Sequence, residues 1–170
     1  MEEHDFDARR PDGAGSLRYV PRWLLVILRL HLGVILLITV AGKIFRPAPF
    51  VEEMMSYLQG YSMRNASVPY QHFLQQVVFP HASLFSYLVV VGEVFAGLSL
   101  LLGLCTRVGA GVAMFLFLNY MLSKGRLFWS PDSEDAAVFF GALVVLIGAA
   151  GRVWGLDSYL AKRWPRFLIW

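Results

Sequence analysis

The sequence contains few charged residues for its length. Asp, Glu, Lys and Arg together make up 16% of the 170 residues, whereas 57% are hydrophobic. Soluble domains carry about 25% charged residues, so this composition excludes an ordinary soluble domain and indicates an integral membrane protein. The net charge of +3 is modest, and we attribute it to membrane topology. We therefore expect the lipid bilayer, and no nucleic acid, as a partner.

Cysteine and histidine are also scarce. Cys105 is the single cysteine, which excludes an intramolecular disulfide, a Cys-x-x-Cys redox pair and a cysteine-ligated iron–sulfur cluster formed by this chain alone. Of the four histidines only His31 lies in a long apolar run, whereas a membrane haem of the b type needs two facing imidazoles. No nucleotide-binding loop, catalytic elbow or cluster of metal-spaced histidines is present. The sequence therefore predicts no metal site and no cofactor bound by this chain alone.

Long apolar runs are abundant. A helix needs about 20 apolar residues to cross the hydrocarbon core of a bilayer, and several runs approach that length. We predict an all-α integral membrane four-helix bundle that occupies residues 21–157. The predicted spans are residues 23–42, 84–104, 108–122 and 136–154.

Both ends of the chain lie outside the predicted bundle. Residues 1–20 are polar and rich in acids, without the apolar core and small-residue cleavage site of a secretory signal peptide. We expect them to form a mobile cytoplasmic tail. Residues 158–170 are basic and aromatic, which is typical of a tail at the membrane interface.

The basic residues predict the orientation of the bundle. Lys and Arg are more frequent on the side that carries both termini than on the side of Lys43, Arg46 and Lys124. By the positive-inside rule both termini face the cytoplasm. We expect the membrane to be a cytoplasmic membrane of the bacterial type.

The segment between the first and second spans is too long for a simple turn. Pro47 and Pro49 end the first helix, and residues 47–83 then show apolar positions at helical spacing. A structureless connection of this length is uncommon. We predict an amphipathic cap of two short helices that lies on the membrane surface or covers the bundle.

A carboxylate interrupts the second apolar run. Glu93 lies at its middle, where an acid costs about 2.5–3.5 kcal/mol on insertion scales and therefore faces a bundle interior or a pathway. Arg29 lies in the first span, about 6 Å from its midpoint, and we predict an intramembrane Arg29–Glu93 charge pair. The alternative is that Arg29 extends to the cytoplasmic interface while Glu93 is protonated in the core.

Further polar residues are expected at the boundary that carries the cap. The carbonyls of a quinone need hydrogen-bond donors such as Lys, His, Tyr or Asn, and its tail needs an exit into lipid. We predict a polar quinone pocket under the cap, with no catalytic residue assigned. Its candidate residues are Lys43, His72, His81, Asn119, Tyr120 and Asp135. The alternative is that Lys43 and Asp135 are boundary anchors, with Asp135 also stabilising a helix start.

Two stretches carry a family resemblance: ITVAGKIF at residues 38–45 and VGEVFAGLSLLLGLCTR at residues 91–107. Together with the helix boundary at Asp135 they resemble the DoxX/DoxD family of small four-span membrane proteins. The resemblance covers roughly residues 29–157. It implies that Lys43 closes the first span in the manner of the family.

The resemblance also implies a redox context. DoxD-like members are the small subunit of a thiosulfate:quinone oxidoreductase, and other members are partners in larger membrane complexes linked to redox homeostasis. Glu93 would correspond to the acid of the second helix in the family.

Three functions follow as hypotheses. The first is an electron-transport role as an integral membrane subunit of a quinone-linked redox complex, which anchors protein partners and contributes to a quinone pocket. Any enzyme activity would then belong to a quinone-dependent oxidoreductase of which this chain is one subunit. The alternative is a cofactor-free structural or accessory subunit of a respiratory or photosynthetic assembly. A small proton-coupled transporter that uses Glu93 is less favoured, because the chain shows no inverted repeat.

Overall fold

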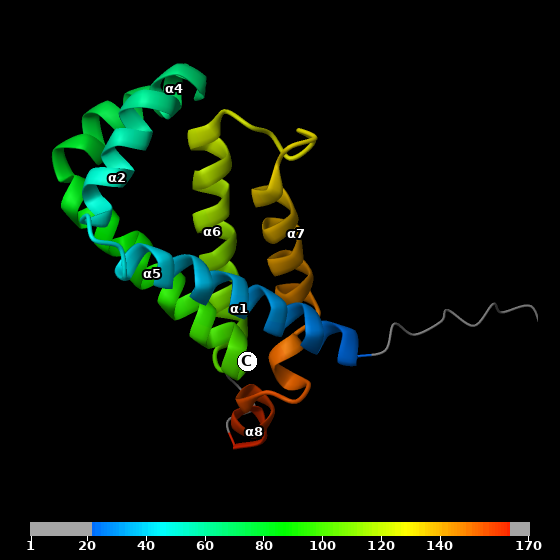
Figure 1. Ribbon diagram of the computed structural model, residues 1–170. Helices are drawn as coiled ribbons and strands as arrows, with labels where there is room; N and C mark the ends of the chain where they lie inside the picture. Colours follow the sequence, from blue (N-terminus) through cyan, green and yellow to red (C-terminus); the bar gives the residue numbers. More distant parts are fainter. Residues whose placement is uncertain (1–21, 164–170) are drawn as a thin grey trace, which may run out of the picture.

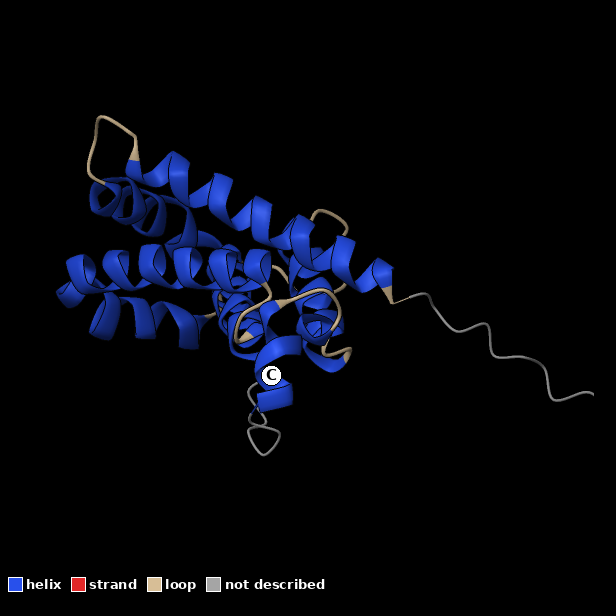
Figure 2. Cartoon of the chain, turned by 90° about the horizontal axis from the view of Figure 1, so that it is seen from below, coloured by secondary structure: helices blue, strands red, loops and turns tan. Residues whose placement is uncertain are grey.

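The computed structural model describes residues 22–163, in which helices and loops occur but no strand (Figures 1 and 2). Four helices form a bundle and shorter helical pieces form a cap, which confirms the predicted all-α membrane bundle. The bundle helices are α1 (Trp23–Ile44), α5 (Ala82–Leu102), α6 (Thr106–Lys124) and α7 (Glu134–Ile147). The cap contains α2 (Phe50–Tyr57), the π-helical turn η1 (Leu58–Ser62), α3 (Met63–Asn65), α4 (Val68–Phe73), the π-helical turn η2 (Leu74–Val78) and the 3-10 turn η3 (Phe79–His81). After α7 come the 3-10 turn η4 (Ala150–Arg152) and α8 (Leu156–Arg163).

The core lies among all four bundle helices. Helix α1 packs against α5, α6 packs against both α5 and α7, and α1 also contacts α7. Aliphatic side chains and alanines fill the centre, and the alanines allow close helix approach. The buried core residues are Leu32, Leu36, Ala96, Leu100, Ala110, Ala113, Leu116, Phe117, Ala142, Val145 and Ala150.

Large apolar side chains cover the outside of the bundle. Helix α1, with 22 residues, and the helical stretch 68–102, with 35 residues, are long and apolar enough to cross a membrane. Ile38, Tyr87, Phe115 and Ile147 point outward and are 66% to 70% exposed. Apolar surface is unfavourable in water, so the hydrocarbon of a bilayer is the solvent that suits this exterior.

A glycine fixes how α1 lies against α5. A Cβ atom at Gly33 would lie 2.9 Å from the backbone N of Leu101 and 3.0 Å from the carbonyl O of Gly97. These are backbone atoms, so a side chain could be accommodated only by moving α5. Gly33 therefore sets the axial register between the two helices.

The cap is a helical hairpin that covers one end of the bundle (Figure 1). Leu58 of its first arm packs with Leu74 and Val78 of its second arm in a small separate core. The second arm runs into α5 as one helical stretch, residues 68–102, and α5 itself begins at Ala82, close to the predicted start of the second span at residue 84. Pro80 lies in the first turn of η3, where a proline is tolerated.

The tip of the cap is anchored on the end of α6. The Tyr70 hydroxyl donates to the carbonyl O and to the Oδ1 of Asn119, both at 3.3 Å. Gly125, which follows α6 with a positive φ of 64°, lies so close to Asn65 that a Cβ atom would collide with its carbonyl O. Both arms of the hairpin thus have a fixed position above the bundle.

The last part of the chain differs from the prediction. Helix α7 ends at Ile147, although the predicted span continues to residue 154, because Gly148 closes the helix and Ala149 has a positive φ of 46°. The expected tail at 158–170 is a helix, α8, as far as Arg163. The expected N-terminal tail at 1–20 and residues 164–170 lie outside the described residues.

Candidate functional site

The α5 helix carries a fully buried carboxylate. Glu93 has an exposed fraction of 0% and lies one turn before Ala96 and Gly97, which are also buried. Small residues at this position let the neighbouring helices approach α5 closely. The sequence-based expectation that this acid faces the interior is therefore met by the geometry.

Lys43 and Tyr120 hold one oxygen of this carboxylate. Lys43 Nζ lies 2.5 Å from Glu93 Oε1, and the Tyr120 hydroxyl donates to the same oxygen at 2.7 Å. Lys43 Nζ also lies 3.4 Å from the Tyr120 hydroxyl oxygen. The three side chains come from α1, α5 and α6, and we call them the Glu93 cluster.

Aromatic rings surround the ammonium group of the cluster. Lys43 Nζ lies 5.1 Å from the ring centroid of Phe50 and 5.4 Å from that of Tyr120, which are cation–π distances. The Lys43 side chain is 16% exposed and Tyr120 is partly buried, whereas Glu93 is fully buried, so the cluster lies mostly inside the protein. The ion pair lies in a low-dielectric setting, where a charged hydrogen bond is stronger than in water.

The other carboxylate oxygen of Glu93 accepts no hydrogen bond from residues 22–163. Oε2 is buried and has no hydrogen-bond partner among residues 22–163. A buried acceptor without a partner costs about 1–3 kcal/mol, so a proton or a ligand hydroxyl at this oxygen would be stabilising. The Lys43 ammonium has three N–H groups, and the described contacts use two of them. The cluster can therefore donate to a carbonyl oxygen and can hold a proton at Glu93.

The predicted Arg29–Glu93 charge pair is wrong. Arg29 is buried, but its guanidinium donates to the carbonyl oxygens of Ala150 at 3.3 Å and Trp154 at 3.4 Å. The cause is the register that Gly33 imposes on α1 and α5. It places Arg29 beyond the end of α5 and brings Lys43, about 21 Å further along α1, to Glu93.

Two other predicted pocket residues are at the cap end but have different partners. Asn119 accepts the hydrogen bond from Tyr70 and donates to the carbonyl O of Phe115, so it anchors the cap. Asp135 is buried and pairs with Lys124, with 2.6 Å between Oδ2 and Nζ. This pair joins the end of α6 to the start of α7.

The two predicted histidines do not reach the cluster. His72 and His81 are both exposed. The Nδ1 atom of His81 lies 3.0 Å from the carbonyl O of Val77 in its own helical stretch. Because α4, η2 and α5 form one continuous helix, neither histidine is turned back over the bundle.

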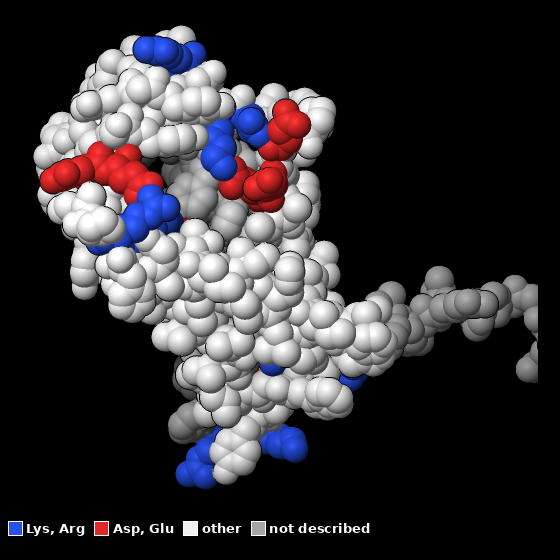
Figure 3. Space-filling model, viewed as in Figure 1, with Lys and Arg blue, Asp and Glu red and all other residues white. Residues whose placement is uncertain are grey.

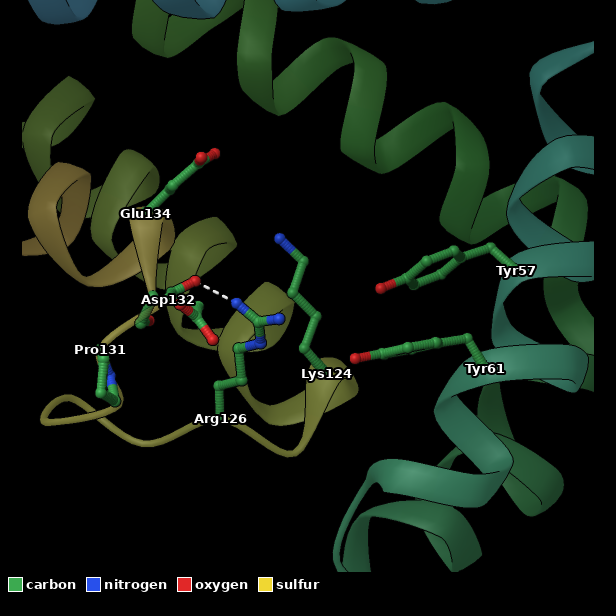
Figure 4. Close-up of a pocket in the computed structure, with 8 residues that line it drawn as sticks. Tyr57, Tyr61, Lys124, Arg126, Pro131, Asp132 and Glu134 are labelled. Atoms are coloured by element: carbon green, nitrogen blue, oxygen red, sulfur yellow. Dashed lines mark hydrogen bonds between the residues drawn. The ribbon is translucent and has the colours of Figure 1, made fainter.

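A cavity of about 550 Å³ does lie between the cap and the loop that joins α6 to α7. Figure 4 shows the tyrosine hydroxyls on one wall pointing across it toward Lys124. Its lining residues are Tyr57, Tyr61, Lys124, Arg126, Pro131, Asp132, Ser133 and Glu134. The predicted quinone pocket was also placed under the cap, but none of its candidate residues lines this cavity.

The walls of this cavity interact electrostatically. Burial raises the pKa of Tyr57, Tyr61 and the Asp135 carboxylate raise it further, and the Arg126 guanidinium opposes the shift. The Tyr57 hydroxyl therefore stays protonated at neutral pH and is available as a donor.

A second buried acid lies at the opposite end of the bundle. Asp157 of α8 is 0% exposed and accepts from the backbone N–H groups of Cys105 at 2.7 Å and Thr106 at 2.9 Å. These groups open α6 and have no partner within the helix, so Asp157 stabilises its N-terminus. The available sequence signal was an acid in the first turn of a short helix near the C-terminus.

No metal centre is formed within the described part of the chain. Residues 22–163 contain no group of three or more His, Cys, Asp or Glu side chains that could hold a metal ion. The Glu93 cluster, with one acid, one ammonium and one phenol, also lacks the ligand set of a metal site.

An apolar exterior around a helical bundle, with a buried carboxylate held by two other helices, defines a small integral membrane protein with an internal polar site. Residues 24–123 match the DoxX family, and the chain belongs to this family. The matched region contains all three members of the Glu93 cluster and the cap. No solved structure matches this chain.

Proposed function

We propose that this DoxX-family protein is an integral membrane subunit of a quinone-linked redox complex and that the Glu93 cluster contacts the quinone headgroup. The observation that supports this most directly is the buried Glu93 side chain, which has one oxygen bound by Lys43 and Tyr120 and one oxygen without a partner. Such a group combines hydrogen-bond donors with a proton acceptor inside a membrane bundle.

The residues fit the chemistry of this ligand class. Reduction of a quinone to a quinol takes up two electrons and two protons. Lys43 would donate its remaining N–H to a carbonyl oxygen, and Glu93 Oε2 would hold or pass a proton at that oxygen. The lone cysteine of the chain forms no dithiol or iron–sulfur cluster by itself, so the electrons would come from a redox group of a partner protein.

The test uses the complex isolated through a tag on this chain. Glu93→Gln keeps the shape of the side chain but removes its proton-accepting charge. We expect quinone-dependent turnover per assembled complex to fall about 100-fold, the lower range for loss of a general base. Glu53→Gln is the matched control, because Glu53 is an acid of the cap that pairs with Arg46 at the surface. Unchanged turnover in Glu93→Gln would overturn the proposal.

A cofactor-free accessory subunit is the second candidate. It is favoured by the fact that Lys43 and Tyr120 both direct hydrogen bonds to the same Glu93 oxygen, as in a purely structural ion pair. In that case Glu93→Gln would reduce the amount of assembled complex, whereas turnover per complex would stay at the wild-type level.

The proposal includes the orientation of the chain. We place it in a cytoplasmic membrane of the bacterial type with both termini inside, on the strength of its basic residues. Cys105 lies in the α5–α6 turn, at the same end as α8, and is the single cysteine. A membrane-impermeant thiol reagent should therefore label inverted vesicles and leave intact cells unlabelled. Labelling of intact cells would contradict this orientation.

A further inference from the structure

The cavity under the cap is separate from the Glu93 cluster. Lys124, which lines it, comes one helical turn after Tyr120 on α6, and neither Lys43 nor Glu93 is among its lining residues. Its volume of about 550 Å³ is within the range of small-molecule sites, which is roughly 300–1,000 Å³. The cavity can therefore hold a ligand of its own.

One set of groups in the cavity consists of hydrogen-bond donors. The Tyr57 and Tyr61 rings stack with centroids 5.3 Å apart, and within the described residues neither hydroxyl has a hydrogen-bond partner. Lys124 gives one N–H to Asp135, and Arg126 donates to the carbonyl O of Asp132. An ammonium has three donors and a guanidinium five, so both cations keep donors for a ligand.

A second set consists of acceptors. The carboxylates of Asp132 and Glu134 line the same cavity, and in the described part of the chain neither forms an ion pair. Figure 3 shows that acidic and basic side chains lie side by side over the end of α6 and the start of α7, beside the hollow under the cap. The hydroxyl of Ser133, another lining residue, is buried without a partner among residues 22–163.

This mixture of charges selects the ligand. A simple anion would be attracted by Lys124 and Arg126 but repelled by the two carboxylates. A simple cation would be attracted by Asp132 and Glu134 but repelled by the two basic side chains. A zwitterion with its two charges a few bonds apart can match both sets. The cavity also lies at the ends of bundle helices, where the polar headgroups of a membrane are found and where tyrosine is enriched.

We propose that the cavity under the cap binds a phosphoethanolamine group, with the phosphate at Lys124 and Arg126 and the primary ammonium at Asp132 and Glu134. Phosphatidylethanolamine is the source that the position at the membrane boundary favours, and a soluble glycerophosphoethanolamine carries the same group. This inference does not depend on the quinone proposal, because it concerns different residues and a different ligand.

The test measures lipid selectivity of the purified chain. The protein is exchanged into mixed micelles with equal amounts of phosphatidylethanolamine, phosphatidylcholine and phosphatidylglycerol, and retained lipids are identified by native mass spectrometry. We expect phosphatidylethanolamine to be retained about tenfold over each competitor, the effect of one charge-assisted hydrogen bond. Phosphatidylcholine has the same phosphate but a methylated ammonium that cannot donate, and phosphatidylglycerol has no ammonium.

Variants of the lining residues test whether the lipid selectivity comes from this cavity. Asp132→Asn with Glu134→Gln should reduce the preference over phosphatidylcholine to less than about twofold, because the ammonium loses its charged acceptors. Arg126→Ala should weaken retention of every phospholipid. Arg64→Ala is the matched control, because Arg64 is an exposed cation of the cap that does not line the cavity.

Each result has a defined meaning. A rise in thermal stability with glycerophosphoethanolamine, lost in Asp132→Asn with Glu134→Gln, supports the same site with a soluble ligand. Equal retention of the three lipids together with no response to glycerophosphoethanolamine overturns the proposal. So does a preference for phosphatidylethanolamine that persists unchanged in the Asp132 and Glu134 variant. These two side chains are exposed, so the variant is expected to fold.

Discussion

Removing Lys43 alone should destabilise the bundle far more than removing the whole Glu93 cluster. In Lys43→Met, the fully buried Glu93 carboxylate keeps only the hydrogen bond from Tyr120. Breaking a buried ion pair by removing one partner costs about 3–5 kcal/mol, and we expect a loss of this size.

The double variant Lys43→Met with Glu93→Met should recover part of this stability. It has no unpaired buried charge, but the Tyr120 hydroxyl loses its acceptor, which leaves a cost of about 1–3 kcal/mol. Adding Tyr120→Phe removes that hydroxyl and should bring the triple variant close to the wild type. Equilibrium unfolding in mixed micelles with increasing denaturing detergent measures each free energy.

The chain offers a matched control for the same chemistry at the surface. Arg46 and Glu53 also form an ion pair, but their side chains are 54% and 47% exposed. Arg46→Met should therefore cost at most about 1 kcal/mol, the range of exposed pairs. If Lys43→Met costs no more than Arg46→Met, or if its cost simply adds to that of Glu93→Met, the described cluster is refuted.

Three further outcomes can be checked on the purified protein. Gly33→Ala should destabilise the bundle by about 1–3 kcal/mol, because its Cβ would press on the backbone of α5. Gly111→Ala, with no atom within 4 Å of its Cβ, should be neutral or slightly stabilising. Equal effects of the two variants in thermal unfolding would contradict the close approach of α1 to α5. Asp157→Asn should cost about 1–3 kcal/mol and increase hydrogen exchange in the first turn of α6, because Cys105 and Thr106 donate to different carboxylate oxygens and asparagine keeps only one of them. Unchanged exchange would show that this acid does not cap α6. Burial, and to a smaller extent the Asp157 carboxylate, raises the pKa of the Cys105 thiol. The alkylation rate of Cys105 should therefore rise at a higher pH than that of free cysteine. A midpoint of the alkylation-rate curve at or below that of free cysteine would contradict this environment.

Helix number and the burial of Glu93 were predictable because they depend on local quantities. The length of each apolar run predicts a spanning helix, and an acid in the middle of one has to face the interior. The partner of that acid was not predictable from depth alone. An Arg29–Glu93 pair requires the first two spans to have matched midpoints, but the contact of Gly33 with Gly97 and Leu101 shifts their register. Such a contact exists only after the helices have packed.

The cap was also predictable only in part. Its helical character follows from periodic apolar residues, and Pro47 and Pro49 correctly mark the end of α1. The sequence does not reveal the continuity of its second arm with α5, because the same pattern also fits a cap of two short helices that are separate from the second span. This continuity leaves His72 and His81 exposed, although both were expected in the pocket. The cavity itself is formed by Tyr57 and Tyr61 from the cap and by residues 124–134, segments far apart in the sequence.

We propose that the Glu93 cluster contacts a quinone, and the quinone content of the purified chain is the most direct test. The tagged protein is extracted from its membrane with a mild detergent, and bound quinone is quantified by chromatography after solvent extraction. We expect the wild type and Glu53→Gln to retain quinone, whereas Glu93→Gln and Lys43→Met should lose most of it. Quinone at background level in the wild type, or at equal levels in all four proteins, would contradict it.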